Sequence, residues 1–230
     1  MFPGVRLVLA TWLLTTTMFL SCTTHTTAPV SSPIHPAPHA DSPAHAVEAF
    51  RWSWQNPSFE TYRTLFTDDY TFEFAVLDSN GGAYRSGTWT RDDELQSFTH
   101  LVAGGGQSEP VASILLTLGS VVVGEDPRPG MSDPERRRLV TASCALRIET
   151  RDGSASQVTG KLRLFLVRGD LANLPADLGR TADAGTWYIE RWEDGTGSIT
   201  GASAAQPAEA ASWGSIKARY RDAATIAARP

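Results

Sequence analysis

The sequence predicts one α+β domain, in which helices come first and a run of antiparallel strands follows. The 230 residues suffice for one domain plus appendages, at about 150 residues per domain. Hydrophobic residues make up 41% of the chain and charged residues 20%, so the chain can bury a core. Apolar residues recur at helical spacing after residue 42 and alternate at strand spacing after residue 110, which sets the order of the elements.

Charge and cysteine content exclude several classes of protein. The formal net charge is −5, whereas a nucleic-acid-binding domain of this size carries a basic surface, so we expect no nucleic-acid partner. Two cysteines are too few for a disulfide-stapled mini-protein or a cysteine-rich zinc site. We therefore expect neither a metal nor a cofactor.

Residues 1–21 are typical of a signal peptide. Arg6 and the amino terminus supply positive charge, and an apolar stretch over 7–21 follows. As a helix this stretch is about 22 Å long, which is short of the ~30 Å hydrocarbon core of a bilayer. A cleaved leader therefore fits better than a membrane-spanning helix.

The end of this leader resembles the lipobox of bacterial lipoproteins. It reads Phe19-Leu20-Ser21-Cys22, with Phe19 standing where leucine is usual. The resemblance implies that Cys22 is acylated and anchors the chain in a lipid bilayer of the cell envelope. The alternative is an ordinary cleaved signal in which Cys22 is incidental. Thr23, where an aspartate would retain a lipoprotein in the inner membrane, favours the outer membrane in a cell that has one.

Residues 22–41 are predicted to form a disordered tether. They are rich in Pro, Thr and His and almost lack large apolar side chains, which favours extended, polyproline-like chain. A histidine-rich tract can chelate metal loosely, but we interpret His25, His35 and His39 as polar spacer residues.

The predicted domain covers residues 42–195 and opens with two helices. Ser42 suits the N-cap of the first helix and Pro43 its first position. The second, shorter helix follows Ser58. Their apolar stripes, at helical spacing, are Val47, Phe50 and Trp54 in the first and Phe59, Tyr62 and Phe66 in the second.

A hairpin and a third helix are expected next. Residues 70–77 alternate between apolar and polar, Asn80-Gly81-Gly82 is a turn signal, and 83–89 returns as a strand. Thr90 then caps a helix that ends at Gly104. We interpret its first-turn carboxylates, Asp92, Asp93 and Glu94, as favourable to the helix dipole, and its apolar stripe as Leu95, Phe98 and Val102.

The rest of the domain is strand-rich. Strands are predicted over 111–123, 139–150, 157–168 and 186–194. The second has a continuous apolar face made of Val140, Ala142, Cys144, Leu146 and Ile148. In the last three of these strands, the residues that alternate with the apolar ones are expected to lie on an outer face and to form cross-strand ion pairs. These charged and aromatic side chains are Arg147, Glu149, Lys161, Arg163, Phe165, Tyr188, Glu190, Trp192 and Asp194.

The C-terminal part divides into a flexible segment over 196–211 and a short helical tail over 212–230. Trp213, Ile216 and Tyr220 form an apolar stripe at i, i+3 and i+7. Because a free tail would expose these rings to water, we expect it to pack back onto the domain.

This order of elements resembles the NTF2-like, or SnoaL-like, cone fold. The residues that carry the resemblance are 46–50 with Trp54, 62–72 and 187–192. The resemblance implies a curved antiparallel sheet wrapped around three N-terminal helices, with a pocket between them. The chain also resembles bacterial predicted lipoproteins of unassigned function. These motifs specify a fold and no reaction.

No residue qualifies as catalytic. His100, near the end of the third helix, is expected to bond a backbone carbonyl, and Glu73 to point outward from its strand. Cys144 is expected to be a buried hydrophobe. The run 136–138 of three arginines is interpreted as a solvated loop. The Gly-x-Ser-x-Gly, Cys-x-x-Cys and His-Glu-x-x-His patterns are absent from the sequence.

Two functional hypotheses remain. The first is a membrane-anchored, non-catalytic domain that binds a small molecule or another protein. The second is a SnoaL-type isomerase, cyclase or hydrolase acting on a small apolar substrate, which requires an Asp or Glu and a Tyr to converge in the cone. Homodimerisation through the outer sheet face is compatible with either.

Aromatic residues locate the expected pocket. Bulky rings that meet imperfectly leave an apolar cleft, so a small apolar ligand is expected near Trp54, Phe74, Trp89 and Trp187. The alternative is a filled core without a cavity.

Overall fold

The computed structural model describes residues 36–75, 88–103, 111–195 and 209–221. The predicted signal peptide, the lipobox with Cys22, most of the tether and the turn at 80–82 lie outside the described residues. Among the described residues, no helix is long and apolar enough to cross a membrane.

Within the described ranges, four α-helices form where the sequence supplies caps. They are α1 Pro43–Gln55, α2 Phe59–Arg63, α3 Arg91–Ala103 and α4 Trp213–Arg219, with a short 3-10 helix at Ala176–Leu178. The Ser42 hydroxyl accepts a hydrogen bond from the His45 amide, and Pro43 stands at the first position of α1, both as predicted. Ser212 and Ser215 form a reciprocal capping box at the start of α4.

The strands form one mixed sheet. Their bounds are β1 Phe66–Glu73, β2 Trp89–Thr90, β3 Val111–Glu125, β4 Arg137–Thr150, β5 Ala155–Arg168, β6 Trp187–Gly195 and β7 Glu209–Ala211. The order is β2-β1-β6-β5-β4-β3, and β7 pairs with β5. The pairs β1–β6 and β5–β7 are parallel, and the others are antiparallel. The sequence predicted the four long strands to within two residues at every end.

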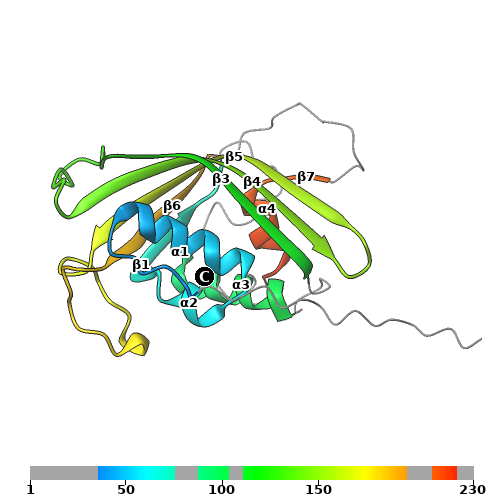
Figure 1. The fold of residues 1–230 in the computed structure, drawn as a ribbon, viewed down its shortest axis with the longest axis horizontal. Helices are drawn as coiled ribbons and strands as arrows, with labels where there is room; N and C mark the ends of the chain where they lie inside the picture. The colour runs from blue at the N-terminus through cyan, green and yellow to red at the C-terminus, as the bar shows by residue number, and fades with distance from the viewer. Residues whose placement is uncertain (1–35, 76–87, 104–110, 196–208, 222–230) are drawn as a thin grey trace, which may run out of the picture. The chain divides into compact units, whose positions relative to one another are not determined.

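Helices and sheet form two layers. The long strands β3 to β6 arch over α1, α2 and α3, and α4 lies on the same side of the sheet (Figure 1). The apolar face predicted for β4, from Val140 to Ile148, is buried against these helices. The side chain of Gln55, at the end of α1, donates a 2.8 Å hydrogen bond to the Leu116 carbonyl and so ties α1 to the edge strand β3. This arrangement confirms the predicted α+β cone.

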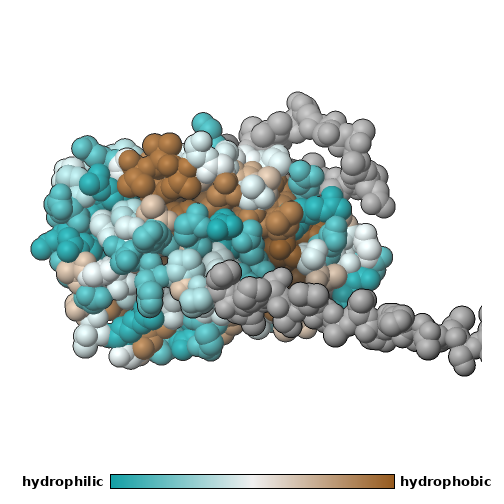
Figure 2. Space-filling view, viewed as in Figure 1, coloured by the Kyte–Doolittle hydropathy of each residue, from teal (hydrophilic) through white to brown (hydrophobic). Residues whose placement is uncertain are grey.

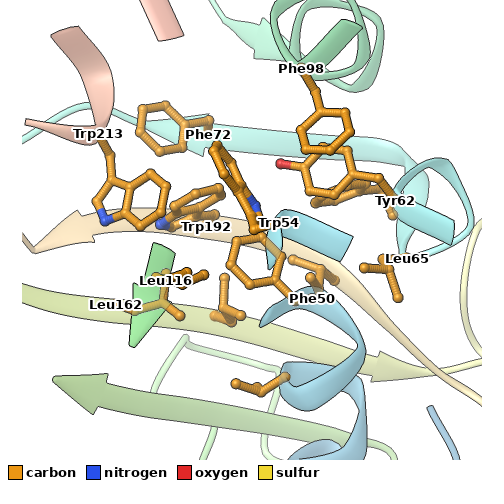
Figure 3. Packing of buried hydrophobic residues seen from close by; sticks show 14 of the residues in the cluster. Phe50, Trp54, Tyr62, Leu65, Phe72, Phe98, Leu116, Leu162, Trp192 and Trp213 are labelled. Carbon is orange, nitrogen blue, oxygen red and sulfur yellow. The ribbon is translucent and has the colours of Figure 1, made fainter. Parts of the chain in front are cut away.

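The core is dominated by aromatic rings from every layer. Trp54 of α1 contacts Tyr62, Phe98 and Trp213, with ring centroids 5.9, 5.4 and 5.2 Å away (Figure 3). Trp213 in turn lies 4.8 Å from Trp192. The rings therefore form one continuous cluster that includes the C-terminal helix.

The predicted outer face is wrong for two residues of β6. The register of β5 and β6 shifts between Phe165 and Leu166, which leaves Glu190 as an extra, unpaired position. This bulge reverses the alternation after it, so Trp192 and Asp194 point into the core while Arg191 and Glu193 point outward. Alternation along a sequence predicts which way side chains face only if the strand has no bulge, so the sequence does not predict this reversal.

The tail prediction is confirmed, with a change of boundary. Trp213, Ile216 and Tyr220 are all buried in the core cluster. The described end of the segment that we expected to be flexible, Glu209–Ala211, is the strand β7. At the other end, Ala40 of the predicted tether packs on the core, and its carbonyl accepts a 2.7 Å hydrogen bond from the Trp187 amide.

Candidate functional site

The four predicted pocket residues all lie in the core cluster. Phe74 and Trp89 meet with ring centroids 5.5 Å apart, and Trp54 reaches the same cluster through Trp213. Trp187 lies at the border of the core cluster and also lines a surface groove of about 540 Å³ beside the start of α1. A second groove, of about 1110 Å³, lies between residues 37–41, α2 and the loop after the 3-10 helix. Both grooves lie outside the ring cluster.

The cone interior instead holds a buried carboxylate, that of Glu94. It lies in the first turn of α3 and its residue is 1% exposed. The Tyr62 hydroxyl donates to Oε1 at 2.5 Å, and the Tyr70 hydroxyl and the Trp89 indole N–H donate to Oε2 at 3.1 Å each. Three donors from α2, β1 and β2 thus converge on one side chain.

A fourth donor, the ammonium group of Lys217, reaches Glu94 from α4. It hydrogen-bonds both carboxylate oxygens, and Lys217 is 2% exposed. The Lys217 Nζ also lies 3.9 Å from the ring centroid of Trp192 and 4.5 Å from that of Phe72. Figure 3 shows these two rings beside Trp213, the first residue of α4. A cation is thereby held between a carboxylate and two aromatic faces.

Burial shifts the pKa values of the side chains around Glu94. Loss of water lowers the pKa of Lys217 to about 8, and the charge of Glu94 partly offsets that effect. Burial, followed by the Glu94 charge, raises the pKa values of Tyr62 and Tyr70 well above their usual range. Both phenols are therefore neutral donors at physiological pH, and Lys217 is mostly charged.

A second buried ion pair stands beside the first. Asp93 accepts hydrogen bonds from the Thr90 amide at 2.9 Å and the Thr90 hydroxyl at 3.0 Å, and it pairs with Arg221. The Arg221 guanidinium lies 5.0 Å above the Trp89 ring. Two consecutive acids of α3 therefore bind two of the three cations near the C-terminal end of the described residues, Lys217 and Arg221.

The sequence contained a signal for both partners of the Glu94 cluster. Glu94 lies at i, i+4 and i+7 with Phe98 and Leu101, which places it on the apolar side of its helix. Lys217 completes the i, i+3, i+4, i+7 pattern of the apolar stripe from Trp213 to Tyr220. A charged residue on each of two apolar stripes predicts a buried pair, whereas we had assigned Glu94 to the helix dipole alone.

The other residues considered for chemistry lie away from this cluster. The His100 Nδ1 lies 3.0 Å from the Tyr220 carbonyl oxygen, which is the backbone contact we predicted. Glu73 points outward and pairs with Arg191, and Cys144 is buried, which raises the pKa of its thiol. The prediction of a solvated loop over 136–138 is wrong for Arg137 and Arg138, which belong to β4, and Arg137 pairs with Glu190 at 2.6 Å.

The described residues hold no group of three or more His, Cys, Asp or Glu side chains that could bind a metal ion. The cluster around Glu94 has the chemistry of an anion that binds a cation in a solvent-inaccessible, aromatic-lined space.

No family model and no curated protein sequence matches the chain. Solved structures share its fold at low identity. An NTF2-like superfamily protein from Salmonella enterica is 12% identical, with a TM-score of 0.45, over 70% of this chain and 92% of that one. A hexachlorocyclohexane dehydrochlorinase is 6% identical, with a TM-score of 0.44, over 70% and 89%. A Mycobacterium tuberculosis protein of unknown function is 12% identical, with a TM-score of 0.41, over 67% and 72%. Likeness at this level concerns the fold and carries no activity over to this chain.

Proposed function

We propose that this chain is a lipid-anchored protein of the bacterial cell envelope, on the basis of the lipobox resemblance at Cys22. We also propose that its NTF2-like domain is a non-catalytic binding module, with the cone interior as its binding site. The state of Glu94 carries the proposal. Four side chains of this protein donate hydrogen bonds to its two carboxylate oxygens, and one of these donors, Lys217, is a cation. Such a carboxylate holds a positive group in place and has no free position facing a substrate proton.

Other ionisable groups near the cone support a non-catalytic role, including buried Asp93, which pairs with Arg221, and buried Asp194, which accepts a hydrogen bond from the Gly214 amide. Tyr62 and Tyr70 are neutral donors committed to Glu94. His100 is engaged with a backbone carbonyl, and Glu73 lies outside the cone. Within the part of the chain that the structure describes, an acid and a base poised on either side of a ligand are therefore not found.

Anchoring at Cys22 supplies the location. The chain between Cys22 and Pro36 extends at most about 50 Å at ~3.3–3.6 Å per residue. Acylation would thus display the domain close to the membrane, in the outer membrane of a cell that has two. Cys22→Ala should move the protein from the membrane pellet to the soluble fraction, with Cys144→Ala as the matched control. Unchanged pelleting of Cys22→Ala would overturn the anchoring.

An enzyme is the second candidate, and one observation favours it. A glutamate and two tyrosines do converge inside the cone, which is the set that a SnoaL-type enzyme on a small apolar substrate requires. With α4 displaced, Glu94 would lose Lys217 and could act as a base toward a bound substrate.

Native mass spectrometry of the full mature chain separates the two candidates. A small molecule that copurifies with the protein and is recovered unchanged after incubation supports the binding module. A molecule that wild type converts, and that Glu94→Gln binds without converting, would overturn the non-catalytic role in favour of the enzyme.

We also propose a second copy of the chain as partner, through the outer face of the sheet at β3. This edge strand carries no charged residue before Glu125, and Leu115 and Val122 are exposed on it. Hydrophobic side chains gather over this strand in Figure 2. The outer face of β5 and β6 is occupied by ion pairs such as Arg163 with Glu193. A Val122→Glu variant should then elute as a monomer where wild type elutes as a dimer, and a wild-type monomer at high concentration would contradict the proposal.

A further inference from the structure

We propose that the cone interior is a receptor site for a primary alkylammonium group, and that Lys217 occupies it as an internal ligand carried by α4. The inference rests on the proposed function and names the ligand class of the same site. Its starting point is the position of the Lys217 Nζ, which marks where a cation binds inside the domain.

The walls of this site complement an ammonium group. The Glu94 carboxylate supplies the counter-charge, and the faces of Trp192 and Phe72 supply the negative side of two ring quadrupoles at 3.9 and 4.5 Å from Nζ. Asp194, which is buried and accepts a 3.1 Å hydrogen bond from the Gly214 amide, adds a second negative group nearby. Carboxylate and aromatic faces together attract a cation far more strongly in a dry interior than in water.

The groups that orient the Glu94 carboxylate, and the two rings that face the cation, lie on elements other than α4. Tyr62, Tyr70 and Trp89, which orient the Glu94 carboxylate, come from α2, β1 and β2, and the two rings come from β1 and β6. The helix α4 supplies the cation, the Trp213 ring that packs on Trp192 and the Gly214 amide that bonds Asp194. The carboxylate is therefore held in position by the cone itself, as a site for an external ligand requires.

Composition indicates that the site selects an ammonium group over a guanidinium group. The chain has eighteen arginines and only two lysines, Lys161 and Lys217. Lys161 is exposed on β5, so the single buried lysine of an arginine-rich chain is the one in this site. An ammonium is a compact point charge that fits between two ring faces and a carboxylate, whereas the planar guanidinium is wider and stacks on one face.

A matched pair of small molecules tests the site in the full chain. Lys217→Ala removes three methylenes and the amine, which together have the shape of n-propylammonium. At pH 7, n-propylammonium at about 100 times its Kd should raise the melting temperature of Lys217→Ala by about 5–10 °C, and 1-propanol at the same concentration should not. In Lys217→Met, whose longer side chain fills the space, the amine should have no effect beyond that of sodium chloride.

A double variant and a refolding assay distinguish a specific amine site from an unspecific effect of the added molecules. Glu94→Gln added to Lys217→Ala should reduce the response to the amine at least tenfold in apparent Kd. If Lys217→Ala does not fold alone, refolding yield should recover with n-propylammonium and not with 1-propanol. Equal responses to amine and alcohol, or no response to either in both formats, would overturn the amine site. That failure leaves the binding module standing, because only Glu94-dependent conversion of a copurified molecule overturns the latter.

Discussion

Lys217→Met is the substitution that most sharply probes the buried pair. Methionine keeps the length and most of the volume of the lysine stem but leaves Glu94, at 1% exposure, without its counter-ion. Removing one partner of a buried pair costs about 3–5 kcal/mol. Because Tyr62, Tyr70 and Trp89 still donate to the carboxylate, we expect the lower end, about 3 kcal/mol. At ~2–4 °C per kcal/mol for a domain of this size, the melting temperature should fall by about 6–12 °C.

Urea unfolding followed by tryptophan fluorescence measures this cost directly, because Trp192 and Trp213 adjoin the substituted side chain. The double variant Lys217→Met with Glu94→Gln removes both charges and should cost less than Lys217→Met and Glu94→Gln added together, by more than about 1 kcal/mol. Arg147→Met, which breaks the solvent-accessible pair with Glu149, is the control and should cost at most about 1 kcal/mol. The buried pair would be refuted if the losses of unfolding free energy in Lys217→Met and Glu94→Gln simply added in the double variant. It would also be refuted if Lys217→Met lost no more than the control.

Three further results are expected. Truncation after Thr200 removes Trp213, Ile216 and Tyr220, each worth about 1.5–3 kcal/mol on burial, so the truncated chain should lose at least 10 °C in calorimetry or fail to fold; an unchanged melting curve would mean that the tail is not part of the core. The pKa of Lys217 is about 8 in the fold against 10.5 for the ordinary group, so the unfolded chain binds more protons between these values and stability rises with pH there. Relative to Lys217→Met, wild type should therefore gain stability as the pH rises above the pKa of Lys217 in the fold, and a gap that is constant with pH would contradict the lowered pKa. The Cys144 thiol is buried with a raised pKa, so in a Cys22→Ala background a thiol reagent at pH 8 should react only after denaturant is added, and immediate reaction would place Cys144 at the surface.

Periodicity and capping predicted most of the elements of this fold and their order, and the resemblance to the NTF2-like fold implied how they are layered. The four long strands follow from alternation, and α1 follows from the Ser42-Pro43 start and the stripe that ends at Trp54. These signals are local, and each reflects burial of a single face. The elements and their order could therefore be predicted from the residues, whereas their arrangement in space was implied by the resemblance.

The candidate site could not be predicted in the same way, because it depends on long-range pairing. Glu94 and Lys217 are 123 residues apart, and only the docking of α4 brings them together. The bulge at Glu190 then turns Trp192 and Asp194 inward to complete the surroundings of the ammonium group. Neither feature has a periodic signature, although two charges on two apolar stripes were a detectable clue.

The central feature of this domain is the enclosure of the Lys217 ammonium in the cone by Glu94, Trp192 and Phe72. Since the chain has only two lysines, NMR of protein labelled with ¹⁵N at lysine Nζ gives two signals that Lys217→Met assigns at once. We predict that the Lys217 signal is protected from exchange with water and that its Cε protons are shifted upfield by the two rings, while Lys161 behaves as a free surface lysine. Two signals with the same rapid exchange and random-coil shifts would contradict the closed cone.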